Sequence, residues 1–180
     1  MNSLRGSLLL ANGGLYDPNF RQTVVLVVEH DESGALGLVL NRPMPASVTA
    51  AAPALASLAT PDERLFAGGP VQPEAAVVLV ESADPALGGK PVFGLVRVLL
   101  EDPSDRGGGG IMRGRVFAGY AGWGPGQLKR EVEALDWITE PATAGDVFSD
   151  EPENLWRKIL TRKGHPYKLL ATMPFDPTTN

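Results

Sequence analysis

A glycine-rich segment at residues 119–127, GYAGWGPGQ, has the most suggestive spacing in the sequence. It runs from a predicted strand into a turn and then into a predicted helix. That arrangement can present free backbone N–H groups and a positive dipole end to an anion. The spacing matches neither a P-loop nor a dinucleotide-binding fingerprint. The structural alternative is that the glycines permit a tight bend, which packs Trp123 over the sheet. The candidate residues are Gly119, Gly122, Trp123, Gly124, Gly126 and Gln127.

Two polar pairs flank a predicted β-hairpin. Glu29 and His30 end its first strand, and Asn41 and Arg42 follow its second strand. His30 is a candidate general base, and Arg42 is a candidate ligand for an anion. The structural alternatives are a surface histidine beside an acidic loop, and an arginine that pairs with an acid or ties a loop down. Strand geometry predicts that the two pairs lie at opposite ends of the hairpin.

Three further segments contain residues that are typical of binding sites, but they lack the spacing of a known binding motif. Gly68 and Gly69 either border a pocket or simply turn the chain before the next strand. The segment 88–91, GGKP, lacks the upstream glycine and the hydroxyl residue of a phosphate loop. The acidic residues within 101–105 do not have the spacing of a calcium loop. We expect a solvated acidic loop there.

The composition excludes several classes of chemistry. The chain has no cysteine, which rules out a disulfide framework, a zinc–thiolate site and a cysteine nucleophile. No G-x-S-x-G motif occurs, so no turn of this kind holds a serine nucleophile for His30 or His165 to activate. The sequence therefore predicts no catalytic residue, no metal site and no cofactor.

Five basic residues near the C-terminus are the best candidates for nucleic-acid binding. They are Arg157, Lys158, Arg162, Lys163 and Lys168. Most of them fall on the polar side or the C-terminal end of a predicted helix, where basic side chains compensate the helix dipole. No helix-turn-helix pattern accompanies them. The formal net charge is −5, and neither half of the chain is basic. We therefore do not expect direct DNA binding.

The elements that must position these residues follow from apolar periodicity. Strands are predicted at 8–11, 23–29, 36–40, 76–81, 92–100 and 115–120. Helices are predicted at 54–59, 127–135 and 150–163. The short connection between 23–29 and 36–40 permits only antiparallel pairing. Residues 83–91 are predicted to form a loop, and the glycine run within 101–110 a mobile surface loop.

Length and apolar content favour one globular domain over residues 1–180. The chain has 180 residues, of which 43% are hydrophobic, and a domain of that size buries a sizeable core without disulfides or metals. The apolar runs are too short for an export signal or a membrane span. These features predict a cytoplasmic protein that makes no membrane contact.

Four segments together resemble the YqgE/AlgH family of bacterial proteins. They are DPNFRQTVVLVVEHDESGALGLVLNRP (17–43), GGPV (68–71), FAGYAGWGPGQLKREVEALDW (117–137) and VFSDEPENLWRKIL (147–160). The resemblance spans nearly the whole chain in the expected order. It implies a compact α+β fold of bent, mainly antiparallel sheets with a few packed helices. It brings no catalytic mechanism with it, only the label of transcriptional regulator from one branch.

Three functions remain open at this point. The first is a binding module, in which a small ligand or protein partner docks where the glycine-rich turn, Trp123 and Arg42 line a groove. The second is a transcription-linked regulator, which rests on the resemblance alone. The third is an uncharacterised enzyme that depends on Glu29 or His30. The sequence does not indicate the oligomeric state.

Overall fold

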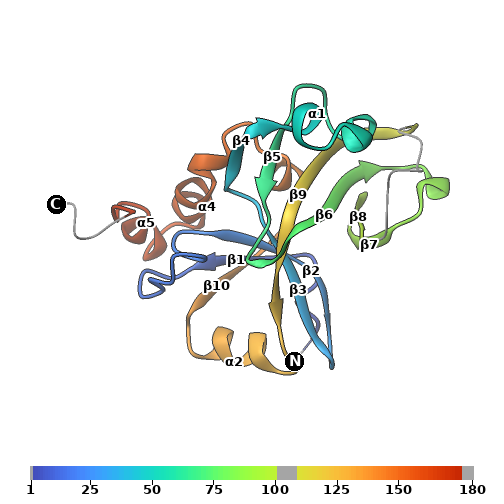
Figure 1. Cartoon of the computed structure of the whole chain (residues 1–180). Helices are drawn as coiled ribbons and strands as arrows, with labels where there is room; N and C mark the ends of the chain where they lie inside the picture. Colours follow the sequence, from blue (N-terminus) through green and yellow to red (C-terminus); the bar gives the residue numbers. More distant parts are fainter. Residues whose placement is uncertain (1, 101–108, 176–180) are drawn as a thin grey trace.

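The computed structural model describes residues 2–100 and 109–175 (Figure 1). The predicted mobile loop at 101–110 falls almost entirely outside the described residues, as do the acidic residues of 101–105. Within the described ranges, ten strands form one sheet with the order β10-β1-β2-β3-β9-β6-β8-β7, and β4 and β5 branch from it beside β9. The strands are β1 (Ser7–Ala11), β2 (Val24–Asp31), β3 (Gly34–Val39), β4 (Pro43–Ser47), β5 (Arg64–Ala67), β6 (Val71–Ser82), β7 (Lys90–Phe93), β8 (Val96–Leu99), β9 (Ile111–Trp123) and β10 (Trp137–Pro141).

The predicted hairpin is confirmed, with a tighter turn than expected. β2 and β3 pair antiparallel, and only Glu32 and Ser33 connect them. The five apolar residues that begin β2 are fully buried, as expected of a β-branched run in the middle of a sheet. Gly34 has a φ of 141°. Glycine adopts that conformation without steric cost, and this allows β2 to continue two residues further and β3 to begin two residues earlier than the polar composition suggested.

Strand β9 is the central element of the fold and is longer than predicted. It pairs antiparallel with β3 and β6 and parallel with β5. The prediction of a strand at 115–120 stopped too early because glycines usually mark turns. Here the backbone of Gly122 stays extended opposite Leu36 of β3. The glycine-rich turn is therefore confined to residues 124–126.

The region after β6 also differs from the prediction. A single strand was expected at 92–100, but two antiparallel strands, β7 and β8, turn at Gly94, whose φ is 49°. The expected loop at 83–91 contains a short 3-10 helix, Pro85–Leu87, and the start of β7. β7 and β8 have only four residues each. The apolar–polar alternation in such short strands does not show where one ends and the next begins.

The helices are short and mostly begin at prolines or capping residues. The predicted helix at 54–59 is a 3-10 helix, Pro53–Leu58, preceded by α1 (Val48–Ala51). The predicted helix at 150–163 is divided into a 3-10 turn, Pro152–Asn154, and α4 (Leu155–Lys163). The remaining helices are α2 (Gln127–Glu133), α3 (Ala144–Val147) and α5 (Tyr167–Leu170). The two elements α2 and α4 confirm the helices predicted from apolar spacing.

The sheet curls, and helices cover parts of both faces (Figure 1). Glu29 of β2 and Lys90 of β7 form an ion pair of 2.6 Å, although several strands separate them in the sheet order. The inner side chains of β1 and β2 pack against α4, including Trp156 and Ile159. On the opposite face of the same strands, Trp123 and Trp137 form a second cluster. This is the α+β architecture that the resemblance implied.

Candidate functional site

Pairing between β3 and β9 brings two of the predicted groups of residues together. Ala35 pairs with Trp123, so the tip of the β2–β3 hairpin lies beside the turn at 124–126. One open hollow there has a volume of about 400 Å³, and a neighbouring one has about 190 Å³. We call them the hairpin basin, lined by Ser3, Glu29, His30, Asp31, Glu32, Ser33, Gly34, Ala35, Leu36, Trp123, Gly126 and Lys129. Arg42, in contrast, follows the other end of β3.

Several polar groups of the hairpin basin have partners within the chain, as His30 and Asp31 show. The Nδ1 atom of His30 accepts a hydrogen bond of 2.9 Å from the N–H of Leu4. The carboxylate of Asp31 accepts hydrogen bonds from the hydroxyl and the N–H of Ser33, and these bonds lower the pKa of Asp31 below its ordinary value of 3.8. Among the residues that the structure describes, no group of three or more acidic or histidine side chains could hold a metal ion.

Trp123 is mainly a packing residue. Only 7% of it is exposed, and its ring lies among those of Phe20 and Trp137. A Cβ atom on Gly37 would come within 3.0 Å of the Trp123 ring. The indole N–H groups of Trp123 and Trp137 both donate to Oε2 of Glu131, at 2.8 and 2.9 Å. These contacts match the structural alternative for Trp123.

The turn at 124–126 is hydrogen-bonded to the beginning of α2. The N–H of Gly124 donates to Oε1 of Gln127 at 3.0 Å, and Nε2 of Gln127 donates to Oε1 of Glu131 at 2.9 Å. Gly126 has a φ of 69° and directly precedes α2. That conformation favours glycine and explains this position without a ligand. Gln127 and Glu131 therefore connect the turn to the tryptophan cluster.

Three of the remaining candidate glycines allow two segments to touch. A Cβ atom on Gly68 would lie 2.3 Å from the carbonyl oxygen of Gly119, and one on Gly69 would lie 2.1 Å from the backbone of Tyr120. Gly119 has a φ of 74°, and a Cβ atom on it would lie 2.6 Å from the carbonyl oxygen of Gly69. These glycines serve the contact between the 68–69 segment and β9. Gly122 is different, because the nearest atoms to an added Cβ are 3.9 Å away.

Asn41 and Arg42 hold the loop at 17–22 in place. Nδ2 of Asn41 donates to the carbonyl of Gln22 at 2.8 Å. The Arg42 guanidinium donates to the carbonyls of Asn19 and Arg21, at 2.7 and 3.2 Å. Burial lowers the pKa of Arg42, since it disfavours the charged form. Of the two roles considered for Arg42, its contacts are those of a residue that ties a loop down.

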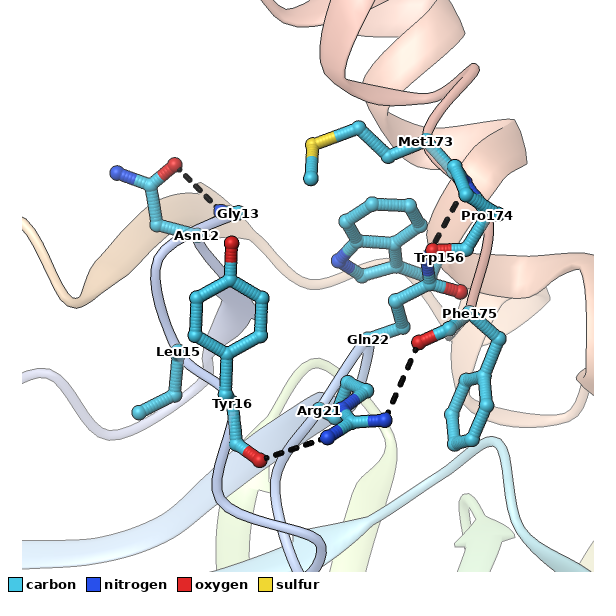
Figure 2. Close-up of a pocket in the computed structure, with 10 residues that line it drawn as sticks. All are labelled: Asn12, Gly13, Leu15, Tyr16, Arg21, Gln22, Trp156, Met173, Pro174 and Phe175. Carbon is cyan, nitrogen blue, oxygen red and sulfur yellow. Dashed lines mark hydrogen bonds between the residues drawn. The ribbon is translucent and has the colours of Figure 1, made fainter. Parts of the chain in front are cut away.

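The loop held in this way binds the C-terminal segment of the chain (Figure 2). Nε2 of Gln22 donates to the carbonyls of Met173 and Pro174, both at 3.1 Å. Arg157 of α4 also bonds this segment and donates to the carbonyls of Ala171 and Met173, the latter at 2.9 Å. Gln22 has a φ of 51°, a conformation that costs a non-glycine residue about 1 kcal/mol or more. The fold holds this strained residue where its amide reaches the segment.

Arg21 extends the same set of donors. Its guanidinium donates to the carbonyl of Tyr16 at 3.1 Å and makes a long contact of 3.5 Å with the carbonyl of Phe175. It also lies over the Phe175 ring, 5.5 Å from the centroid. Its Nε atom is buried, and within the described residues it has no hydrogen-bond partner. Tyr16 and Phe175 are 52% and 54% exposed, so aromatic surface borders this guanidinium.

An apolar socket lies between these donors. Trp156 is 2% exposed and donates its indole N–H to the carbonyl of Ala11. A Cβ atom on Gly13 would lie 2.9 Å from Sδ of Met173, so the methionine packs closely against a position without a side chain. With the C-terminal segment in place, little free space remains around this socket. We call the space between the 12–22 loop, Trp156 and the C-terminal segment the tail groove (Figure 2). Its walls are Asn12, Gly13, Leu15, Tyr16, Arg21, Gln22 and Trp156, and Met173, Pro174 and Phe175 of the C-terminal segment lie in it.

Comparison with known proteins identifies the fold and the family. A model of the AlgH-like family matches residues 8–168. The chain belongs to the AlgH-like family. A UPF0301 protein of Streptomyces avermitilis is 42% identical over all of this chain and 97% of its own length, and one of Mycobacteroides abscessus is 42% identical over 97% of this chain and 87% of its own.

Solved structures agree with this assignment. A crystal structure of a Corynebacterium diphtheriae protein superposes with a TM-score of 0.83 at 26% identity, covering 96% of this chain and 93% of that one. The solution structure of AlgH from Pseudomonas aeruginosa has a TM-score of 0.71 at 30% identity, over 96% and 95%. In the described part of this AlgH-like chain, no helix is both long and apolar enough to cross a membrane.

The basic cluster of this AlgH-like chain is largely engaged in internal contacts. Arg162 donates to both carboxylate oxygens of Asp146, at 3.0 and 2.8 Å. Lys163 pairs with Glu140 at 2.6 Å. Together with the contacts of Arg157 to the C-terminal segment, these interactions reduce the charge that is available to a phosphate backbone.

Sequence reasoning missed the residues of the tail groove. Arg21 and Gln22 occur in the first family-like segment and Trp156 in the fourth, but neither pattern contains a recognised ligand motif. Nothing in the sequence shows that Gln22 adopts a positive φ, since glutamine rarely does. The available signal was Asn41-Arg42, which was singled out as a candidate pair and proves to support this loop.

Proposed function

We propose that this AlgH-like chain is a binding module that takes a short peptide segment of a protein partner in the tail groove. The observation that carries the proposal is the set of side-chain donors directed at main-chain carbonyls. Gln22, Arg157 and Arg21 all donate to carbonyl oxygens of residues 171–175. A segment bound in this way is recognised as polypeptide, because every peptide presents the same carbonyl groups.

The chemistry of the donors supports a binding role. Two of the three are guanidinium groups, and hydrogen bonds from charged donors contribute about 1.5–3 kcal/mol each. In the described residues, neither Arg21 nor Arg157 forms an ion pair with an acid. Their charge is therefore directed at peptide carbonyls. Exposed Tyr16 adds an aromatic side chain of the kind enriched at protein interfaces.

Strain at Gln22 supports the same reading. Residues held in an unfavourable backbone region are enriched at active sites, ligand-binding sites and switch regions, and the surrounding fold must offset their cost. Asn41 and Arg42 supply that support by bonding the carbonyls of Gln22 and Arg21. The pair that the sequence singled out would thus act as positioning residues behind the site.

The test uses a chain shortened to residues 1–172, which leaves Ala171 in its buried place and empties the rest of the groove. Amide and indole NMR signals are followed while short peptides of varied sequence are added at millimolar concentration. We expect the Gln22 side-chain amide and the Trp156 indole to shift with peptides that bind. A folded shortened chain whose groove signals respond to none of the peptides would contradict the proposal.

Two variants make the test specific to the groove. Gln22→Ala removes the amide that bonds two carbonyls, and we expect it to weaken peptide binding by about tenfold. Lys158→Ala is the matched control, since Lys158 is an exposed base on α4 next to Arg157. Equal losses in both variants would indicate a nonspecific effect of substitution and not the proposed contacts.

A further inference from the structure

We infer that the partner segment has an apolar–proline–aromatic sequence, and that the chain's own Met173-Pro174-Phe175 occupies the tail groove as a displaceable competitor. The inference rests on the proposed function and names both the ligand class and its regulation. Each of the three residues has a distinct contact in the groove: Met173 packs at Gly13, the Pro174 carbonyl accepts from Gln22, and the Phe175 ring lies beside Arg21. These neighbours define what a second peptide must offer.

The first position requires a flexible apolar side chain. Met173 is half-buried and packs against Gly13, where any side chain on residue 13 would collide with the thioether. Leu170 also lies within 2.6 Å of the position of such a Cβ atom. Methionine suits an irregular socket of this kind because it is unbranched and polarisable.

The second position favours proline. The groove presents N–H donors to the segment from Gln22, Arg157 and Arg21, so a peptide that is rich in acceptors is its complement. Proline has a carbonyl but no N–H, and it leaves no unpaired donor facing those groups. It also fixes its own φ and restrains the residue before it, which lowers the entropy lost on binding.

The third position favours an aromatic ring. The Arg21 guanidinium lies over the Phe175 ring at 5.5 Å from its centroid. A guanidinium at this distance is attracted to the face of an aromatic ring. An aliphatic residue at the same place would keep the carbonyl contact and lose the ring contact.

The resident segment is shallowly held, which makes it displaceable. Pro174 and Phe175 are both exposed, and Met173 is only half-buried. The segment follows α5, whose four residues include no buried side chain. Segments with few buried apolar contacts open at much lower free energy than the core. A tethered copy nevertheless acts at millimolar effective concentration, so it competes with an external peptide.

The deciding experiment compares acetyl-Met-Pro-Phe-amide with two matched peptides, acetyl-Met-Ala-Phe-amide and acetyl-Met-Pro-Ala-amide. Their affinities for the 1–172 chain and for the full chain are measured from the shifts of the Gln22 amide and the Trp156 indole. We expect the parent peptide to bind the shortened chain at least about tenfold more tightly than the full chain, because the tethered segment competes only in the latter. Each matched peptide should bind the shortened chain more weakly than the parent.

The outcomes separate this inference from the proposed function. If many sequences bind the shortened chain equally well, the groove is a peptide site, but the apolar–proline–aromatic assignment is wrong. If the full and shortened chains bind the parent peptide with equal affinity, the segment is no competitor. If no peptide binds a folded shortened chain, the inference and the proposed function both fall.

A second variant covers the case in which the shortened chain does not fold. The full-length triple variant Met173→Ser, Pro174→Ala, Phe175→Ser keeps the length of the segment and removes its recognised chemistry. The parent peptide should then bind this variant at least about tenfold more tightly than the unaltered chain. Equal affinities for the two chains would overturn the inference.

Discussion

At the scale of single residues, several candidates serve the fold, and their chemistry is directed inward. Glu131 accepts hydrogen bonds from Trp123, Trp137 and Gln127, so one carboxylate satisfies three donors beneath the glycine turn. Buried donors without partners are costly. The side chains that looked most like a ligand surface in the sequence are therefore bound to one another.

Replacement of Trp123 tests its packing role. We expect Trp123→Ala to lower the free energy of unfolding by about 3–5 kcal/mol, since it leaves a large cavity and removes a donor from Glu131. Urea denaturation measures the change. Leu135→Ala is the control, because Leu135 is 70% exposed, and its effect should be within about 0.5 kcal/mol. A near-neutral Trp123→Ala variant would instead favour a ligand-facing role.

Asp31 gives a prediction for the dependence of stability on pH. Hydrogen bonds from Ser33 lower the pKa of the folded carboxyl below its ordinary value of 3.8. A lowered folded-state pKa stabilises the fold at pH values above the unfolded pKa, and this contribution disappears as the pH falls through the folded value. The stability advantage over Asp31→Asn should therefore be present at neutral pH and vanish in strong acid. An advantage that grows on acidification would contradict this assignment.

At the scale of elements, the glycines differ in what they allow. Gly119 has a positive φ and packs against the backbone of the 68–69 segment, whereas a Cβ atom on Gly122 in the same strand would meet only ordinary contacts at 3.9 Å. The first lets two elements approach each other. The second is not required by packing and faces solvent.

This difference provides a matched pair of substitutions in β9. Gly119→Ala should cost more than about 2 kcal/mol of unfolding free energy, because it combines a left-handed conformation with a backbone collision. Gly122→Ala should change stability by less than about 1 kcal/mol. Thermal unfolding of both variants measures the difference. Similar costs for the two would show that the close approach at Gly119 is not what the glycine supplies.

At the scale of the whole molecule, the sequence predicted the class of fold better than its details. β2 was recognisable from its continuous apolar run, which is buried on both faces of the sheet, and α4 from the helical spacing of its apolar residues. The division of 92–100 into two strands and the extension of β9 through Gly122 were not, because long-range pairing decides them. The tail groove was beyond prediction for the same reason, since its donors come from residues 21, 22 and 157 and its acceptors from 171–175.

The central position of β9 has a consequence for motion. Its 13 residues pair with β3, β5 and β6, so no small opening of the molecule can release all of its amide protons. Native-state hydrogen exchange should therefore show the amides in the middle of β9 exchanging only through global unfolding. The amides near Met173 should exchange fastest among the described residues around the tail groove. Such a difference in exchange rates would show that the C-terminal segment opens locally while β9 stays folded.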